Sequence, residues 1–478
     1  MLFNSIEFLI FLPLVFFGYW FVFKSLRWQN LFVVAVSYLF YGWWDWRFLL
    51  LILFTSLCSY LSGVYLEKCA GNRLVQKWIS AGNILLNLSI LGVFKYFDFF
   101  TENLVNVLHL LGWDADYVTL NILLPVGISF YTFQALSYTI DVYQGKIKAT
   151  HDIVAFFAYI SFFPQLVAGP IERATHLLPQ FLRPRNFDCD LALDGIRQML
   201  WGFFKKVVVA DNCAVFVNGV FENYQTLDGS TLFLGAFFFT IQIYGDFSGY
   251  SDIAIGCARL FGIDLMQNFK YPYFSRDIAE FWRRWHISLS SWLRDYLYIS
   301  LGGNRKGKFR QYLNLIITMF LGGLWHGASW NFVLWGTFHG IALAVHKMWM
   351  SITGRKKGEQ SHGWRRVFGV IITFHFVCFC WIFFRNADFQ NSMDMLRQIF
   401  TTFRPQLFPQ LIEGYWRVFA LMLLGFLLHF TPDSWENAAC RGVIRLPFLG
   451  KALLMVALIY LVIQMKSSEI QPFIYFQF

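Results

Sequence analysis

The feature that most constrains this chain is a long succession of apolar runs, each close to the length that crosses a lipid bilayer. Inside a bilayer the backbone polar groups have no water to bond, so an apolar run of about 20 residues folds as a helix. We therefore predict an all-α polytopic membrane protein with about eleven transmembrane helices, plus interfacial and re-entrant helices. The runs lie near residues 8–23, 31–44, 48–66, 79–97, 119–140, 152–170, 195–220, 231–257, 312–325, 329–346, 367–384, 415–431 and 447–464.

The composition indicates the same class of protein. Charged residues make up 14% of the chain, against roughly 25% in a soluble domain. The formal net charge of +10 fits cytoplasmic loops beside anionic lipid, so membrane lipid is the expected partner and nucleic acid is not. The first run, 8–23, lacks a basic region before it and a cleavage site after it, which favours a retained helix over a signal peptide. We predict one integral membrane domain over residues 1–478.

The interval 263–310 differs from a plain span, because Arg and Lys alternate there with Trp, Tyr and Phe. Such a segment is typical of helices in the membrane interface, with rings at the acyl boundary and cations toward the headgroups. By the positive-inside rule, this interfacial segment is expected on the cytoplasmic side. Anchoring at the membrane explains most of its residues, but it does not explain His286 or Asp295.

His326 lies between glycines, in Gly322–Gly327, within one of the most apolar stretches of the chain. Basic residues on both sides of 312–346 indicate that the chain enters the membrane, turns and returns as a helical hairpin. Along a helix, His326 is about 24 Å from Arg310, well inside a hydrocarbon core about 30 Å thick. An ionisable group at that depth is costly, which makes His326 a candidate functional residue. The flanking glycines predict close approach of another molecule.

Polar groups also interrupt three other apolar segments. These lie at 124–141, 162–173 and 242–252, and the last contains Asp246 and Ser248. Such groups either line a substrate path or form hydrogen bonds that hold helices together. A path through Asp246 and His326 would also suit a transporter or flippase, although the sequence has no inverted repeat of broken segments. The eight cysteines show no metal-ligand spacing, and we predict no metal site.

Five segments, in this order along the chain, resemble membrane-bound O-acyltransferases, and within that family the bacterial alginate O-acetyltransferase type. They are LPVGISFYTFQALSYTIDVY, FFPQLVAGPIER, QIYGDFSGYSDIAIG, FWRRWHISLSSWLRDYLYISLGGNR and GGLWHGASWNFVLWGTFHG. The resemblance runs from roughly Phe3 to Arg385 and is weaker beyond that point. D-alanyl transferases of the family share the WHIS and WHG elements, whereas the GGNR element favours the alginate-acetylase branch.

The resemblance implies helices around a central tunnel, with a catalytic role for His326. It also implies a second functional position at His286, where other members carry Asn or His, so that a base and an orienting role both stay open. Acyl transfer to a hydroxyl needs a proton acceptor near neutrality, which histidine supplies. For His339, tunnel lining and a structural role are equal alternatives. The substrate-binding or tunnel residues expected beside the two histidines are Trp325, Asp246, Ser248, Arg283, Arg284, Arg294, Asp295 and His339.

These observations favour a membrane O-acetyltransferase of the bacterial cytoplasmic membrane. The resemblance implies acetyl-CoA as the donor substrate, with no bound cofactor, and the cations of 263–310 would bind its phosphates. The acetyl group would pass through the protein to an extracytoplasmic polysaccharide hydroxyl, or to a partner acetyltransferase that carries it onward. Because a Gly-x-Ser-x-Gly element is missing from the sequence, direct transfer is preferred over a serine acyl-enzyme. A D-alanyl transferase with a thioester carrier protein is the nearer alternative.

Overall fold

The computed structural model describes residues 1–114, 116, 119–120, 122–166, 169–354, 361–386 and 388–429, and beyond these only scattered positions that include 473–474. Its regular elements are all helices, and no strand occurs in this described part, which confirms the predicted all-α class. The chain divides into two compact units. Unit 1 is Met1–Ile196 with Ala254–Met266, and unit 2 is Arg197–Ile253 with Gln267–Phe478.

Several helices of unit 1 begin at a polar side chain that caps them. Ser5 accepts from the backbone N–H of Phe8 at 3.3 Å, and Asp152 accepts from that of Ala155 at 3.0 Å. Each satisfies a donor that the first helical turn leaves unbonded. The elements are α1 (Ile6–Phe17), η1 (Gly18–Val22), α2 (Leu26–Gly42), η2 (Trp46–Phe48), α3 (Leu49–Lys68), α4 (Arg73–Leu110), α5 (Ile128–Tyr143), α6 (Ile153–Ser161), α7 (Phe163–Leu166), α8 (Ala174–Phe181) and the start of α9 (Cys189–Phe203).

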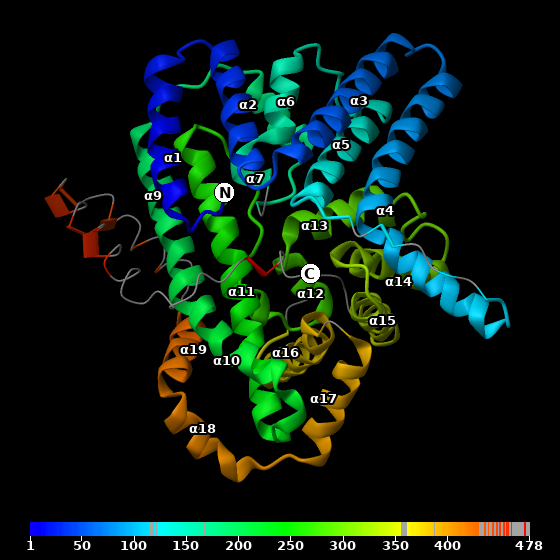
Figure 1. Cartoon of the computed structure of the whole chain (residues 1–478), viewed down its shortest axis with the longest axis vertical. Coiled ribbons are helices and arrows are strands. Elements are labelled where there is room, and N and C mark those ends of the chain that lie inside the picture. The colour runs from blue at the N-terminus through cyan, green and yellow to red at the C-terminus, as the bar shows by residue number, and fades with distance from the viewer. Residues whose placement is uncertain are drawn as a thin grey trace. The chain divides into compact units, whose positions relative to one another are not determined.

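Helices α3, α4 and α5 pack against one another in unit 1 (Figure 1). Asn83 of α4 donates to Thr139 of α5 at 2.6 Å and to Ser59 of α3 at 3.3 Å, and all three side chains are buried. Hydrogen bonds of this kind hold membrane helices together, because apolar burial gives little preference for another helix over lipid. In the polar segment 124–141, Thr139 therefore takes the interhelical role that the sequence left as one of two alternatives.

Three helices are long and apolar enough to cross a membrane, judged by length and composition over the described residues. They are Trp46–Lys68, Arg73–Leu110 and Trp364–Arg385, and a fourth is added if the bent pair Pro405–Gly414 and Trp416–Leu427 is one span. Several other apolar runs are broken: helix begins only at Ile128 in the run 119–140, and the run 152–170 divides into α6 and α7. These helices are consistent with a membrane protein. The count of about eleven spans stays a prediction.

Unit 2 begins in the last turns of α9 and contains two π-helical segments, η3 and η6. Its elements are η3 (Phe204–Ala210), α10 (Asp211–Glu222), η4 (Tyr224–Thr226), α11 (Gly229–Leu260, whose last turns belong to unit 1), η5 (Pro272–Phe274), α12 (Ile278–Arg284), α13 (Ile287–Trp292), η6 (Leu293–Tyr298), α14 (Lys308–His326), α15 (Trp330–Ile352), α16 (Trp364–Arg385), α17 (Phe389–Thr401), η7 (Pro405–Leu407), α18 (Phe408–Gly414) and α19 (Trp416–His429). π-Helical turns are rare and are frequent at functional sites.

Helices α14 and α15 correspond to the predicted hairpin over 312–346 and lie side by side (Figure 1). Glycines permit their close contact. A Cβ added at Gly323 would lie 2.2 Å from the carbonyl oxygen of Phe332, and one at Gly336 would lie 2.3 Å from that of Met319. The close approach that we predicted for another molecule is therefore made at Gly323 by the neighbouring helix.

The interval 263–310 is divided into several short helical elements, and its place at the cytoplasmic membrane interface stays a prediction. It forms the short helices α12 and α13 and the π-helical η6. The rings of Phe281, Trp285 and Trp292, which we expected at the acyl boundary, are buried inside unit 2. Their aromatic surface is used in packing against other rings, such as Phe281 on Trp285 with centroids 5.6 Å apart, and not in contact with lipid.

Candidate active site

Three histidines of unit 2 lie in one buried cluster of aromatic rings. The Trp325 ring centroid is 6.1 Å from that of His286 and 5.0 Å from that of His326. The Trp335 ring is 4.9 Å from His326 and 4.9 Å from His339. Two indoles therefore connect residues from α12–α13, α14 and α15. The structure brings together four predicted site residues, His286, Trp325, His326 and His339, from distant parts of the sequence.

His326 is the last residue of α14 and is 6% exposed. The rings of Trp335 and Phe384 meet its imidazole edge-to-face, at centroid distances of 4.9 and 5.3 Å. The C-terminal end of a helix carries partial negative charge from its carbonyl groups, which favours a cationic side chain. This position favours a protonated imidazole at His326, and the catalytic role of this residue stays a prediction.

His286 connects α12 to α13 in a left-handed backbone conformation, with φ 43° and ψ 55°. For a residue with a Cβ this conformation costs about 1–3 kcal/mol, and strained residues of this kind cluster at functional sites. Backbone hydrogen bonds on both sides hold it: Ile287 N–H donates to the Asn268 carbonyl, and Lys270 N–H donates to the Arg284 carbonyl, each at 2.9 Å. The imidazole is fully buried, with Nδ1 3.1 Å from Asn268 Oδ1.

His339 is fully buried on α15, four residues after Trp335 and therefore on the same helix face. Trp282 Nε1–H donates to His339 Nδ1 at 3.3 Å. Because the indole nitrogen only donates, Nδ1 must be the acceptor, and the ring proton of His339 lies on Nε2. This contact gives His339 a structural partner, and its role as a tunnel residue stays a prediction.

Asp246 belongs to a buried ionic cluster of unit 2. Its carboxylate lies 2.6 Å from Lys206 Nζ, which also lies 2.7 Å from Asp211, and it accepts from the backbone N–H of Ile474 at 2.7 Å. A buried carboxylate needs such partners to offset its lost hydration. Of the two alternatives, substrate path or contacts within the protein, these partners favour contacts within the protein for Asp246, and its role toward substrate stays a prediction. Ser248 is also buried, and its Oγ has no hydrogen-bond partner among the described residues.

Residues near the C-terminus approach the histidine cluster, which sequence reasoning missed. The Phe473 ring lies 4.4 Å from that of Tyr250 and 5.6 Å from that of Phe247. Phe247 in turn lies 4.7 Å from His286, centroid to centroid. Asp246 in an apolar segment was the one sequence signal of this contact, because a buried carboxylate requires partners. Nothing near Asp246 in the sequence indicates that its partner is Ile474.

The charged residues predicted to bind substrate are divided among several contacts. Arg284 lies 2.7 Å from Glu280, and Arg294 lies 2.6 Å from Asp295. Arg283 is exposed on α12. The Arg294–Asp295 pair is partly exposed and contributes little to stability, whereas Arg284 pairs with a buried carboxylate. The predicted role of these residues in substrate binding stays a prediction.

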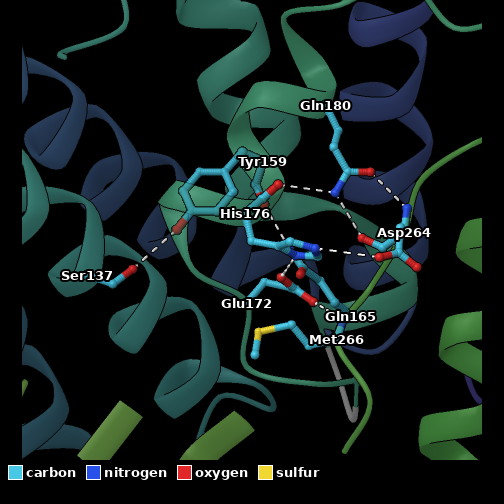
Figure 2. A network of polar contacts seen from close by, with 8 residues as sticks. All are labelled: Ser137, Tyr159, Gln165, Glu172, His176, Gln180, Asp264 and Met266. Carbon is cyan, nitrogen blue, oxygen red and sulfur yellow. Dashed lines mark hydrogen bonds and ion pairs between the residues drawn. The ribbon is translucent and has the colours of Figure 1, made fainter. Parts of the chain in front are cut away.

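Unit 1 contains a separate network of polar contacts, centred on His176 (Figure 2). The Glu172 carboxylate is fully buried; it lies 2.8 Å from His176 Nδ1 and accepts from Met266 N–H at 2.6 Å. His176 Nε2 lies 3.5 Å from Asp264, and Gln180 bonds the Asp264 backbone at 2.8 and 2.9 Å. Asp264 and Glu172 raise the pKa of His176 to about 10. The sequence offered one signal, the i,i+4 spacing of Glu172 and His176.

The sequence around the three clustered histidines matches a known protein family. The model described as "MBOAT, membrane-bound O-acyltransferase family" matches residues 146–387, which include all three clustered histidines. The chain belongs to the membrane-bound O-acyltransferase family. It is therefore an acyltransferase, as predicted.

Curated relatives agree with this membership. The chain is 42% identical over 403 residues to "Probable alginate O-acetylase AlgI" of Pseudomonas aeruginosa, covering 84% of this chain and 75% of the relative. It is 37% identical over 499 residues to the protein of the same name from Pseudomonas putida, covering 100% of both. It is 35% identical over 432 residues to "Peptidoglycan O-acetyltransferase" of Helicobacter pylori, covering 83% and 79%. The predicted resemblance to the alginate O-acetylase branch is confirmed.

Proposed function

We propose that this acyltransferase takes acetyl groups from acetyl-CoA on the cytoplasmic side of the bacterial inner membrane and transfers them to hydroxyls on the outer side. The acetyl group passes through a central tunnel to the outer side. The acceptor there is a polysaccharide, or a partner acetyltransferase that carries the group onward. The names of the relatives support acetyl as the transferred group and an envelope polymer as its destination. The observation that carries the proposal is His326, buried at the end of α14 in a cluster of three histidines.

In the proposed reaction His326 accepts the proton of the acceptor hydroxyl while that oxygen bonds to the carbonyl carbon of the acetyl thioester. The carbon–sulfur bond then breaks, and the proton passes from His326 to the departing CoA sulfur. The products are the acetyl ester and free CoA, so His326 ends as it began. The carbonyl end of α14 favours the transient imidazolium, and the aromatic walls exclude water that would hydrolyse the thioester.

The donor end of this route is the interval 263–310, with Arg283 and Arg284 as the cations that meet the phosphates of acetyl-CoA. Arginine matches phosphate geometry through its planar set of N–H donors. Two observations support this role: Arg283 is exposed, and the Arg284 side chain is 30% exposed although it pairs with Glu280. Acetyl-CoA is a substrate in this scheme, and no resident cofactor is proposed.

The test uses the full chain in lipid nanodiscs with acetyl-CoA labelled in the acetyl group, and follows label transfer to an envelope polysaccharide or a soluble partner domain. We expect His326→Ala to lower transfer by roughly 10²–10⁴-fold, the cost of losing a general base. His362→Ala is the matched control, because His362 is exposed and lies outside the cluster. Unchanged transfer by a folded His326→Ala protein would contradict the proposal.

Two other outcomes would replace the proposal. Transfer only from an aminoacyl thioester of a carrier protein would identify a D-alanyl transferase. Movement of a polymer or lipid across a sealed bilayer without cleavage of acetyl-CoA would identify a transporter or flippase.

A further inference from the structure

The side chain of Asn268 lies at the centre of a buried hydrogen-bond set that surrounds His286. Its Oδ1 accepts from Ser288 Oγ at 2.9 Å and from the Ser288 backbone N–H at 3.3 Å, and it lies 3.1 Å from His286 Nδ1. Its Nδ2 donates to Ser251 Oγ at 3.2 Å. Asn268, Ser251, His286 and Ser288 are each 2% exposed or less. Nothing in the sequence had marked Asn268.

This set determines which ring nitrogen of His286 carries the proton. The backbone N–H of Ser288 can only donate, so the amide atom that faces it must be the oxygen. The amide orientation is therefore fixed, and His286 Nδ1 faces an acceptor. Ser288 Oγ also lies 3.4 Å from Nδ1, but its proton goes to Asn268 Oδ1 at the shorter distance of 2.9 Å. Nδ1 is therefore the donor to Asn268 Oδ1, which leaves Nε2 as the nitrogen with the lone pair.

His286 Nε2 is available to a ligand. It is buried and has no hydrogen-bond partner among the described residues. The rings nearest to the imidazole are those of Phe247 at 4.7 Å and Trp325 at 6.1 Å, centroid to centroid. Buried polar atoms are usually bonded, so an unpartnered acceptor in an active-site cluster points to a donor group on a substrate.

We propose that Asn268 is a positioning residue, which holds His286 with its proton on Nδ1 so that Nε2 accepts a hydrogen bond from a hydroxyl of the acceptor other than the one whose proton His326 takes. This inference rests on the proposed function, because it names the hydroxyl acceptor as the ligand of Nε2. The backbone of Asn268 holds the strained turn through Ile287, whereas its side chain holds the ring. Side-chain variants therefore alter the imidazole and keep the backbone contact.

The rate experiment compares two Asn268 variants by their dependence on pH. Asn268→Leu removes the acceptor, and we expect transfer to fall roughly tenfold to hundredfold through misplacement of the ring. Asn268→Asp keeps acceptor oxygens but adds negative charge, which favours the imidazolium of His286. As the pH is lowered, the transfer rate of Asn268→Asp is expected to begin falling at a pH about one unit or more higher than in the unmodified protein.

Asn314→Leu is the matched control. Asn314 is fully buried in unit 2, and its side-chain nitrogen donates to the backbone carbonyls of Leu301 and Gly303. We expect it to lower thermal stability while the transfer rate per folded molecule and its pH profile stay unchanged. Equal effects of the Asn268 and Asn314 variants would overturn the positioning role.

A second measurement does not depend on activity. Nitrogen-15 spectra of histidine-labelled protein report which ring nitrogen is protonated, and loss of a signal in His286→Asn assigns it to His286. We expect protonated Nδ1 in the unmodified protein and a mixture of tautomers in Asn268→Leu. Protonated Nε2 in the unmodified protein would overturn the inference. Protonated Nδ1 in a protein that transfers no acetyl group would support the positioning and refute the proposed function.

Discussion

His286 combines a reactive side chain with a strained backbone, and the two properties can be separated by mutation. His286→Ala and His286→Gly both remove the imidazole, but only glycine takes a φ of 43° without steric cost. We expect His286→Gly to be more stable than His286→Ala by about 1 kcal/mol. Thermal unfolding of both variants in the same lipid mixture measures the difference. Equal stability would mean that the turn relaxes and that the strain is absent in the protein.

At His176 the ionic contacts predict a dependence of stability on pH. Asp264 and Glu172 raise its pKa to about 10 from the ordinary 6.5. The folded protein therefore binds a proton that the unfolded chain releases above pH 6.5, so the stabilisation is complete below that value and is lost as the pH rises through about 10.

His176→Gln tests this dependence. We expect it to lower the melting temperature at pH 6 and to have little effect above pH 10, with exposed His362→Gln as the control. A difference in melting temperature that does not change with pH would show that His176 contributes through packing alone.

Sequence reasoning singled out His326 and His286 because short motifs mark them, and their functional roles stay predictions. It passed over Asn268 and the His176 cluster. An asparagine in a loop has no periodicity, and its value depends on Ser251 and Ser288, which come together only in the folded chain. Glu172 and His176 are four residues apart, but Asp264 becomes their partner through tertiary folding.

At the scale of elements, the contact between α14 and α15 positions two members of the cluster. An added Cβ at Gly336 would lie 2.3 Å from the Met319 carbonyl oxygen and 2.9 Å from Gly323 Cα, so backbone must move. Gly336→Ala is expected to cost about 1–3 kcal/mol, as overpacking does. Transfer should also fall, because Gly336 follows Trp335, whose ring contacts both His326 and His339.

Gly219→Ala is the control for Gly336→Ala. Gly219 lies inside α10 with no heavy atom within 4 Å of its added Cβ. Because alanine favours helix over glycine, this variant should be neutral or more stable by about 0.5–1 kcal/mol. A stable, active Gly336→Ala protein would show that the two helices need no close contact.

Helices were easier to predict than their breaks. Apolar runs indicated helix correctly, since lipid and protein interiors both require bonded backbone. The same runs did not show where α6 ends before α7, or that 263–310 folds into α12, α13 and η6. Rings at an interface and rings in a protein core have the same sequence pattern, and only tertiary packing placed Trp285 inside.

At the scale of the whole molecule, the sequence was sufficient for the class and the family, because both depend on composition and on motifs. The division into two units and the contact of Ile474 with Asp246 depend on residues far apart in sequence. Contacts of that kind have no local signal. The side of the membrane on which each loop lies is a further property of the whole molecule, and it decides the route of the acyl donor.

The hairpin of α14 and α15 makes this topology testable. Lys308 Nζ donates to Ser351 Oγ at 2.7 Å, so the start of α14 and the end of α15 lie on the same side. Exposed Lys306 and Thr353 flank these ends. In a protein whose native cysteines are replaced, Lys306→Cys and Thr353→Cys should both react only with thiol reagents applied from the cytoplasm, since the flanking Lys and Arg favour that side.

The two cysteine reporters also check each other. Labelling from opposite sides would contradict the hairpin, because its ends are bonded together. Labelling of both from outside would keep the hairpin but reverse its orientation. His326, at the turn end of α14, would then lie toward the cytoplasm, and interval 263–310, which precedes α14, would lie outside, where acetyl-CoA is not supplied. The proposed route of the acetyl group therefore requires both reporters to label from the cytoplasm.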